Sequence, residues 1–283
     1  MELQVVEKSD EEQFAYPKAT EVSPRPQLTA TSASSIFLSY LVVQAGSALV
    51  VGMSAAAVGG ILATLNGKNV RDPRVLSGIV LQSQSLSVTA GIVFGAIAMI
   101  LLSIRLVPSS LKSADPTGAA WRIGSTRMLG VGLVVGITIS IFNVLWSLLM
   151  RLAFVTATAT PLTAATPLVA MGMTRGPSQI MYAMIALLFA PITEELLFRG
   201  ILYGGFRKSF GPGIAAVFVT AMFVGCHYYT LRAFPPAALG LALLASACLW
   251  LRLRTGSLGP SIAAHTAFNF LPVLITAIVT AIN

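Results

Sequence analysis

The residues that could do chemistry in this sequence are few. Only two carboxylates, Glu194 and Glu195, and two histidines, His227 and His265, fall inside its long apolar stretches. An ionisable group within a membrane costs roughly 2.5–3.5 kcal/mol on insertion scales, so each of these four needs a structural or functional reason. Carboxylate and imidazole groups are also the usual participants in general acid–base catalysis. The four residues therefore form the candidate site.

The first motif lies in the segment 190–200. Glu195 and Arg199 are four residues apart with the acid first, which favours an ion pair on one face of a helix. Glu194 is rotated about 100° from Glu195, so we expect it to stay unpaired and face a water-filled cavity. Pro191 removes a backbone donor and predicts a bend just before the pair. The alternative is a charged cluster whose side chains reach the membrane surface from a helix end.

Two further pairs have the same spacing of four residues. Phe223 and His227 share one helical face, where His227 could orient a water molecule; the alternative is an interfacial histidine beside the two tyrosines that follow it. His265 and Asn269 also share a face, and together they could stabilise a developing oxyanion. The alternative for this pair is hydrogen bonding between helices, which is common for Asn and His in membranes.

Membrane-spanning helices must position these motifs. The chain has 283 residues, of which 55% are hydrophobic and 10% charged, and its mean hydropathy is +0.82. Soluble domains carry roughly 25% charged residues, so the composition predicts an all-α, polytopic transmembrane helical bundle of about seven to eight spans. The expected spans are 36–65, 75–107, 128–150, 179–206, 212–229, 235–250 and 260–282, and residues 154–173 are either a membrane-embedded connection or an eighth span.

The positive charge of the chain fits this arrangement. The net charge is +8, but the basic residues lie in loops between apolar runs, without a basic cluster that would indicate nucleic-acid binding. The tail and the loops after the second, fourth and sixth expected spans would lie on one side of the membrane, and they hold eleven basic residues. The loops on the other side hold six. The positive-inside rule therefore predicts a cytoplasmic amino terminus.

Taken together, the three motifs resemble those of the CPBP family of intramembrane proteases, which comprises CAAX proteases and bacteriocin-processing enzymes and is also called Abi. The resemblance rests on Glu194-Glu195-x-x-x-Arg199, Phe223-x-x-x-His227 and His265-x-x-x-Asn269, which occur in this order on separate apolar segments. The family includes the type II CAAX prenyl endopeptidase. The resemblance covers about residues 178–275.

The resemblance implies a fold and a set of roles. It implies a helical bundle around a cavity, with a cavity-lining four-helix catalytic core, and a glutamate-dependent endopeptidase. Glu194 would be the general base, His227 would help to hold the water, and His265 with Asn269 would stabilise the oxyanion. Glu195, Arg199 and Phe223 would support these catalytic residues.

This interpretation divides the chain into three parts. Residues 1–35 would be a polar cytoplasmic tail with a net charge of −3, residues 36–127 would be accessory transmembrane helices, and residues 128–283 would be the intramembrane protease core. The short loops and the resemblance indicate a bacterial plasma membrane.

No cofactor is expected. Two glutamates and two histidines could also bind zinc, because His₂Glu is a ligand set of zinc peptidases. None of the three motifs is the His-Glu-x-x-His arrangement of those enzymes, so metal-dependent catalysis ranks second.

The expected partners are the lipid bilayer and a peptide or membrane-anchored protein substrate, either prenylated or not. Two other functions remain open from the residues alone. One is a proton-coupled carrier that uses Glu and His as a relay, and the other is a non-catalytic scaffold or immunity protein on the same fold.

Overall fold

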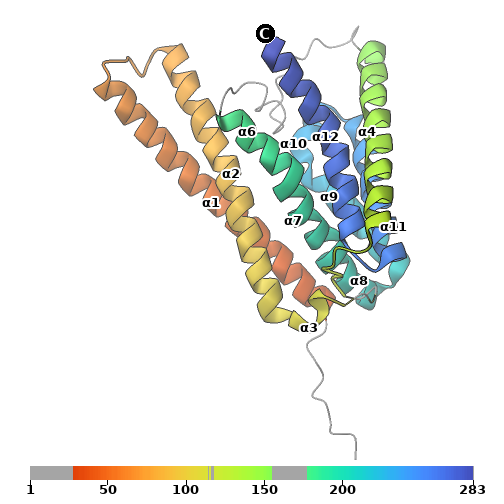
Figure 1. The fold of residues 1–283 in the computed structure, drawn as a ribbon. Coiled ribbons are helices and arrows are strands. Elements are labelled where there is room, and N and C mark those ends of the chain that lie inside the picture. Colours follow the sequence, from red (N-terminus) through yellow and green to blue (C-terminus); the bar gives the residue numbers. More distant parts are fainter. Residues whose placement is uncertain (1–27, 114, 116–117, 155–176, 283) are drawn as a thin grey trace, which may run out of the picture.

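The computed structural model describes residues 28–113, 115, 118–154 and 177–282. Within these ranges the ordered elements are helices (Figure 1). In chain order they are α1 (Ala30–Leu65), α2 (Pro73–Leu106), α3 (Pro108–Leu111), α4 (Thr126–Phe154), α6 (Pro177–Met184), η2 (Ile185–Phe189), α7 (Ala190–Glu194), η3 (Glu195–Leu202), α8 (Tyr203–Phe210), α9 (Pro212–Cys226), α10 (Tyr228–Ala233), α11 (Ala237–Thr255) and α12 (Gly259–Ile282).

The described part contains six helical segments that are long and apolar enough to cross a membrane. They are Ala30–Leu65, Pro73–Leu106, Thr126–Ala153, Gln179–Phe210, Ala237–Thr255 and Gly259–Ile282. Together with the shorter apolar helix α9, they confirm the polytopic helical bundle, and the chain is an integral membrane protein. The alternative eighth span, 154–173, lies outside the described residues except for its first residue, which ends α4.

Several helix ends differ from the apolar runs of the sequence, for local reasons. Helix α1 begins at Ala30, not at 36, because Thr29 and Ser32 form a capping box that satisfies its first backbone donors. The expected polar tail is therefore too long by several residues. Helix α9 is shorter than the expected span 212–229, because the chain leaves the helix at His227 (φ −88°, ψ 29°).

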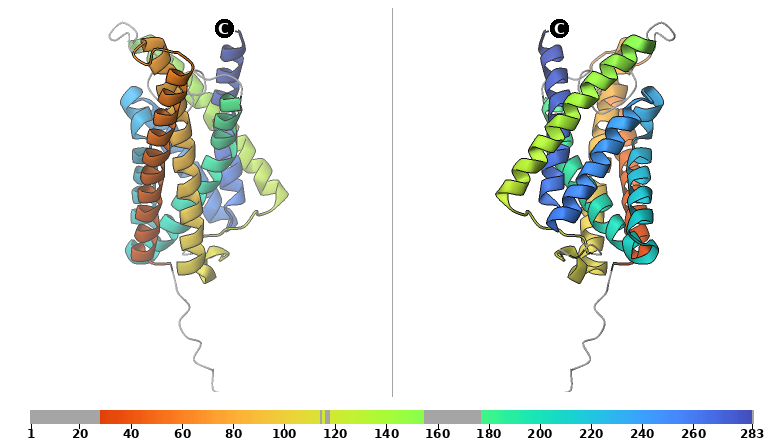
Figure 2. Two further views of the ribbon diagram at one scale, coloured as in Figure 1. Left: turned by 90° about the vertical axis from the view of Figure 1, so that its left-hand side faces the viewer. Right: turned by 90° about the vertical axis from the view of Figure 1, so that its right-hand side faces the viewer.

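The helices form two groups on either side of one central helix (Figure 1). Helices α1 and α2 make an antiparallel hairpin on one side, and α4, α11 and α12 lie on the other. Segments α6, η2, α7, η3 and α8 follow one another without a break and form the central helix, residues 177–210. The turned views in Figure 2 show that α4 crosses α12 obliquely.

One apolar core joins these groups. It contains Ile36 of α1, Met99 of α2, Leu197 of the central helix, Phe223 of α9 and Leu244 of α11, and all five are buried. Many large apolar side chains on the outer faces of the helices are exposed, as expected where lipid replaces water. The hairpin expected to be accessory thus packs into the same core as the helices that carry the motifs.

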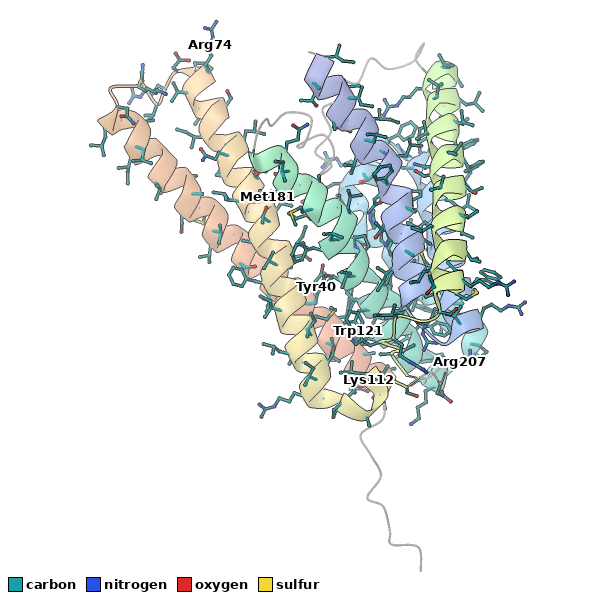
Figure 3. The ribbon with its side chains drawn as sticks, in the orientation of Figure 1. Tyr40, Arg74, Lys112, Trp121, Met181 and Arg207 are labelled. Atoms are coloured by element: carbon teal, nitrogen blue, oxygen red, sulfur yellow. The ribbon has the colours of Figure 1, made fainter. Side chains whose placement is uncertain are left out.

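The segment between α3 and α4 closes one end of the bundle. Buried Arg252 of α11 donates from Nη2 to the carbonyl oxygens of Gly118, at 2.7 Å, and Asp115, at 3.1 Å. The carbonyl of Ala119 lies against Gly200, where a Cβ would come within 2.9 Å of its oxygen. Figure 3 shows Lys112, Trp121 and Arg207 at this end and Arg74 at the other. These two carbonyl groups bind the guanidinium, which allows the side chain of Arg252 to be buried. Helix α11 runs to Thr255, beyond the expected end of this span at 250.

Helices α4 and α12 approach closely through two glycines. A Cβ on Gly132 would overlap the carbonyl oxygen of Pro260, and a Cβ on Gly136 would overlap that of Ala264. The small-xxx-small spacing of the two glycines allows this contact. Ala264 precedes His265, so the close packing fixes the position of the third motif.

We expect Gly136→Ala to lower the free energy of unfolding by about 1–3 kcal/mol, because the added methyl forces α4 away from α12. The measurement is thermal unfolding in detergent. Gly130→Ala on the same helix is the control, because a Cβ there meets no atom within 4 Å, and it should leave stability unchanged or slightly higher. Equal stability of the two variants would contradict the close contact.

Candidate active site

The central helix presents the two glutamates at a change of helical winding. Glu194 is the last residue of α7 and Glu195 the first of η3, a π-helical segment. A second π-helical segment, η2, ends just before Pro191 in α7. Short π-helical segments within helices occur frequently at functional sites. At Pro191, where the sequence predicts a bend, the helix changes its winding and continues unbroken.

A buried ionic network surrounds Glu195. Its Oε1 accepts from Nη1 of Arg199 at 3.0 Å and from Nδ1 of His265 at 2.9 Å. The relative exposures of the Glu195, Arg199 and His265 side chains are 0%, 1% and 4%. The ion pair expected from the spacing of four is present, and a histidine from α12 joins it. One carboxylate oxygen therefore ties the central helix to α12.

Glu194 has a different environment from its neighbour. Its side chain is 23% exposed, and its Oε2 lies 3.8 Å from Nε2 of His265. Within the described part of the chain, this oxygen has no hydrogen-bond partner. The ring of His265 thus stands between the two carboxylates, bonded to Glu195 and facing Glu194.

Phe223 of α9 forms the apolar wall of the site. Its ring centroid is 4.3 Å from the guanidinium carbon of Arg199, 4.8 Å from the ring of His227 and 5.8 Å from that of His265. The face of an aromatic ring attracts a cation, so Phe223 also stabilises the buried guanidinium. Phe223 therefore connects the three motifs.

His227 lies at the end of α9, next to the exposed Tyr228 and Tyr229. Its Nδ1 donates to the carbonyl oxygen of Phe223 at 2.8 Å, which places the proton on Nδ1 and leaves Nε2 as an acceptor in the neutral ring. Helix α9 is about 22 Å long, shorter than the hydrocarbon core of a bilayer.

Asn269 contacts the backbone of the central helix and not the carboxylates. Its Nδ2 donates to the carbonyl oxygen of Ala186 in η2 at 2.8 Å. An amide nitrogen carries two N–H groups, so a second donor is left. The structure thus gathers Glu194, Glu195 and His265 tightly, with His227 across Phe223, and holds Asn269 one turn further along α12.

Three contributing residues were missed by the sequence analysis. Thr266 of α12 donates to the carbonyl oxygen of Leu187 at 3.0 Å. Tyr40 of α1 is nearly buried and lies within electrostatic range of Glu194. Arg252 fixes the closing segment. A polar residue within an apolar span is the signal that could have found Tyr40 and Thr266, but threonine and tyrosine are common in such spans.

The charges of the site nearly cancel. Two carboxylates and the guanidinium of Arg199 leave one negative charge, and the ring of His265 lies between the two carboxylates. Nδ1 of His265 is bonded to Glu195, so its Nε2 faces Glu194. The arrangement can therefore hold a proton donor and a carboxylate base side by side.

A metal centre would require a cluster of suitable ligands. Glu194 and His265 are the nearest pair that could bind a metal ion, through Oε2 and Nε2. Across the ranges that the structure describes, no group of three or more His, Cys, Asp or Glu side chains is arranged to hold one. The preference for a metal-free site stays a prediction.

We expect Glu195→Gln to lower the free energy of unfolding by about 3–5 kcal/mol, because it leaves the buried Arg199 without its counter-ion. Glu194→Gln is the matched control, since Glu194 Oε2 has no hydrogen-bond partner, and its stability should stay near wild type. Thermal unfolding in detergent compares the two. A Glu195→Gln variant as stable as wild type would exclude the structural role of the ion pair.

Comparison with known proteins agrees with the motifs. Residues 176–271 match the family model described as type II CAAX prenyl endopeptidase Rce1-like. No curated protein and no solved structure matches the chain. The matched range begins just before α6 and includes every motif residue. Over residues 176–271 the chain is thus similar to the Rce1-like family, in agreement with the resemblance of its three motifs to the CPBP family.

Proposed function

We propose that this protein is an intramembrane endopeptidase in which Glu194 activates the attacking water. The family match supports a CAAX-type membrane protease at family level. The observation that carries the finer assignment is the unequal environment of the two adjacent carboxylates. Glu195 is fully buried and its Oε1 is bonded to Arg199 and His265, whereas the side chain of Glu194 is 23% exposed and approaches His265 only to 3.8 Å. A partly exposed carboxylate can meet a water molecule, whereas the fully buried Glu195 cannot.

The reaction can be assigned to atoms of this site. Glu194 takes a proton from a water molecule held by Nε2 of His227, and the water oxygen attacks the carbonyl carbon of the scissile peptide bond. Nε2–H of His265 and the second N–H of Asn269 donate to the oxyanion that forms. The proton held by Glu194 then passes to the leaving nitrogen as the C–N bond breaks. Glu195 and Arg199 hold His265 in the orientation that this requires.

The proposed substrate is a peptide segment of a membrane-anchored protein. The motif residues lie on apolar helices whose outer faces carry exposed large apolar side chains, and Glu194 is only 23% exposed among them. A peptide must therefore reach the site from the membrane. A prenylated peptide ending in a CAAX sequence is the first probe to test, because it matches the description of the family.

The distribution of charge supports a cytoplasmic amino terminus. Basic residues at the end where α1 begins outnumber those at the opposite end among the described residues, and the rule of positive inner loops places the richer end in the cytoplasm. The richer end holds Arg105, Lys112, Arg122, Arg127, Arg207, Lys208, Arg252 and Arg254, and the other holds Lys68, Arg71, Arg74, Arg151 and Arg232.

We expect Glu194→Gln to lower the rate of cleavage by at least about 100-fold, because it removes the base without changing the shape of the side chain. The assay measures release of product from a quenched fluorescent, farnesylated CAAX peptide by the purified protein in liposomes, and mass spectrometry compares peptides from membranes that contain either form. Gly130→Ala should retain full activity. Unchanged products from Glu194→Gln would exclude Glu194 as the base.

Chelators should leave the activity intact, because Glu194 and the two histidines supply the catalytic groups. The same peptide is assayed after dialysis against a strong chelator, with a known zinc peptidase treated in parallel as the control. Loss of activity that added zinc restores would replace the metal-free mechanism by a metal-dependent one.

A further inference from the structure

Two carbonyl groups of the central helix lie where its regular hydrogen bonding is interrupted. The backbone N–H of Ala190 bonds to the carbonyl of Ile185, five residues earlier, so it is not available to Ala186. In regular α-helical bonding the partner of Leu187 would be the N–H of residue 191, which is a proline and has none. A backbone carbonyl inside a membrane needs a hydrogen-bond donor, and a neighbouring helix can supply one where the regular bonding of its own helix is interrupted.

Side chains of α12 provide the donors. Thr266 donates from Oγ1 to the carbonyl of Leu187 at 3.0 Å, and Asn269 donates from Nδ2 to that of Ala186 at 2.8 Å. Other threonines of α12 behave differently. Thr276 donates to Pro272 at 2.8 Å, a residue four positions earlier in its own helix, as threonines within helices usually do. The bond of Thr266 therefore joins two helices instead of staying within one.

This bond lies next to the ionic network. Thr266 follows His265, and these two consecutive residues of α12 bind the central helix at two points, Leu187 and Glu195. Two points of attachment fix both the rotation of α12 and its position along the central helix. The same attachment sets the 3.8 Å separation between Nε2 of His265 and Oε2 of Glu194.

We propose that Thr266 is a positioning residue, whose bond to the carbonyl that Pro191 leaves without a partner aligns His265 with Glu194. Thr266 lies between the two motif positions on α12 and has no role in the reaction assigned above. The kinetic consequence rests on the proposed function, but the bond itself does not. Pro191 and Thr266 thus act as a pair, because Pro191 removes the α-helical donor of the Leu187 carbonyl and the hydroxyl of Thr266 supplies another.

A thermal double-mutant cycle tests the bond without any assay of activity. Thr266→Val keeps the shape of the side chain but removes the donor, and we expect it to lower the Tm in detergent. Pro191→Ala restores the missing N–H, so Thr266→Val should lower the Tm less in that background. Thr276→Val is the matched control and should show no such dependence on residue 191. Equal losses of Tm in both backgrounds would overturn the pairing of Thr266 with Pro191.

Kinetics then separate positioning from stability alone. With the farnesylated peptide, Thr266→Val should lower kcat by about 10- to 100-fold at nearly constant KM, because a small misplacement of catalytic groups slows the chemical step. Thr266→Ser keeps the hydroxyl and should restore most of kcat. An unchanged kcat for Thr266→Val would overturn the positioning role. If wild-type protein cleaves no peptide, the proposed function fails, and the thermal cycle still decides whether the bond exists.

Discussion

The whole arrangement depends on a charge that must be neutralised inside a membrane. Glu195 is completely buried, and a carboxylate in that position is tolerable only because Arg199 and His265 bond to the same oxygen. Arg199 comes from the same helix, but His265 comes from α12, 70 residues further along the chain. Neutralising Glu195 therefore requires the two helices to pack in one register, and that register brings His265 to Glu194.

Backbone hydrogen bonding imposes the same register a second time. The π-helical winding of η2 and the proline in α7 leave carbonyls that α12 satisfies through Thr266 and Asn269. On its other side, α12 is held by close contact with the glycines of α4. The irregular part of the central helix is thus compensated by its neighbour, as expected where no water can reach the backbone.

Adjacent positions in a helix allow two identical residues to serve different purposes. Glu194 and Glu195 differ in rotation about the helix axis, so one points to the buried network and the other to the partly exposed side. Glu195 fixes the orientation of His265, and its neighbour Glu194 is the proposed base. Phe223 separates this pair from His227 and covers the guanidinium of Arg199 with its ring.

The sequence by itself determined the contacts that lie within one helix. The spacing of four residues brings Glu195 to Arg199 and His227 to the carbonyl of Phe223, because the helical repeat alone places such residues on one face. Only the tertiary structure decided that His265 bonds to Glu195, that Asn269 bonds to Ala186 and that Arg252 is buried. These contacts depend on the rotation and axial position of separate helices, which are set by packing across the bundle and not by the repeat of any one segment.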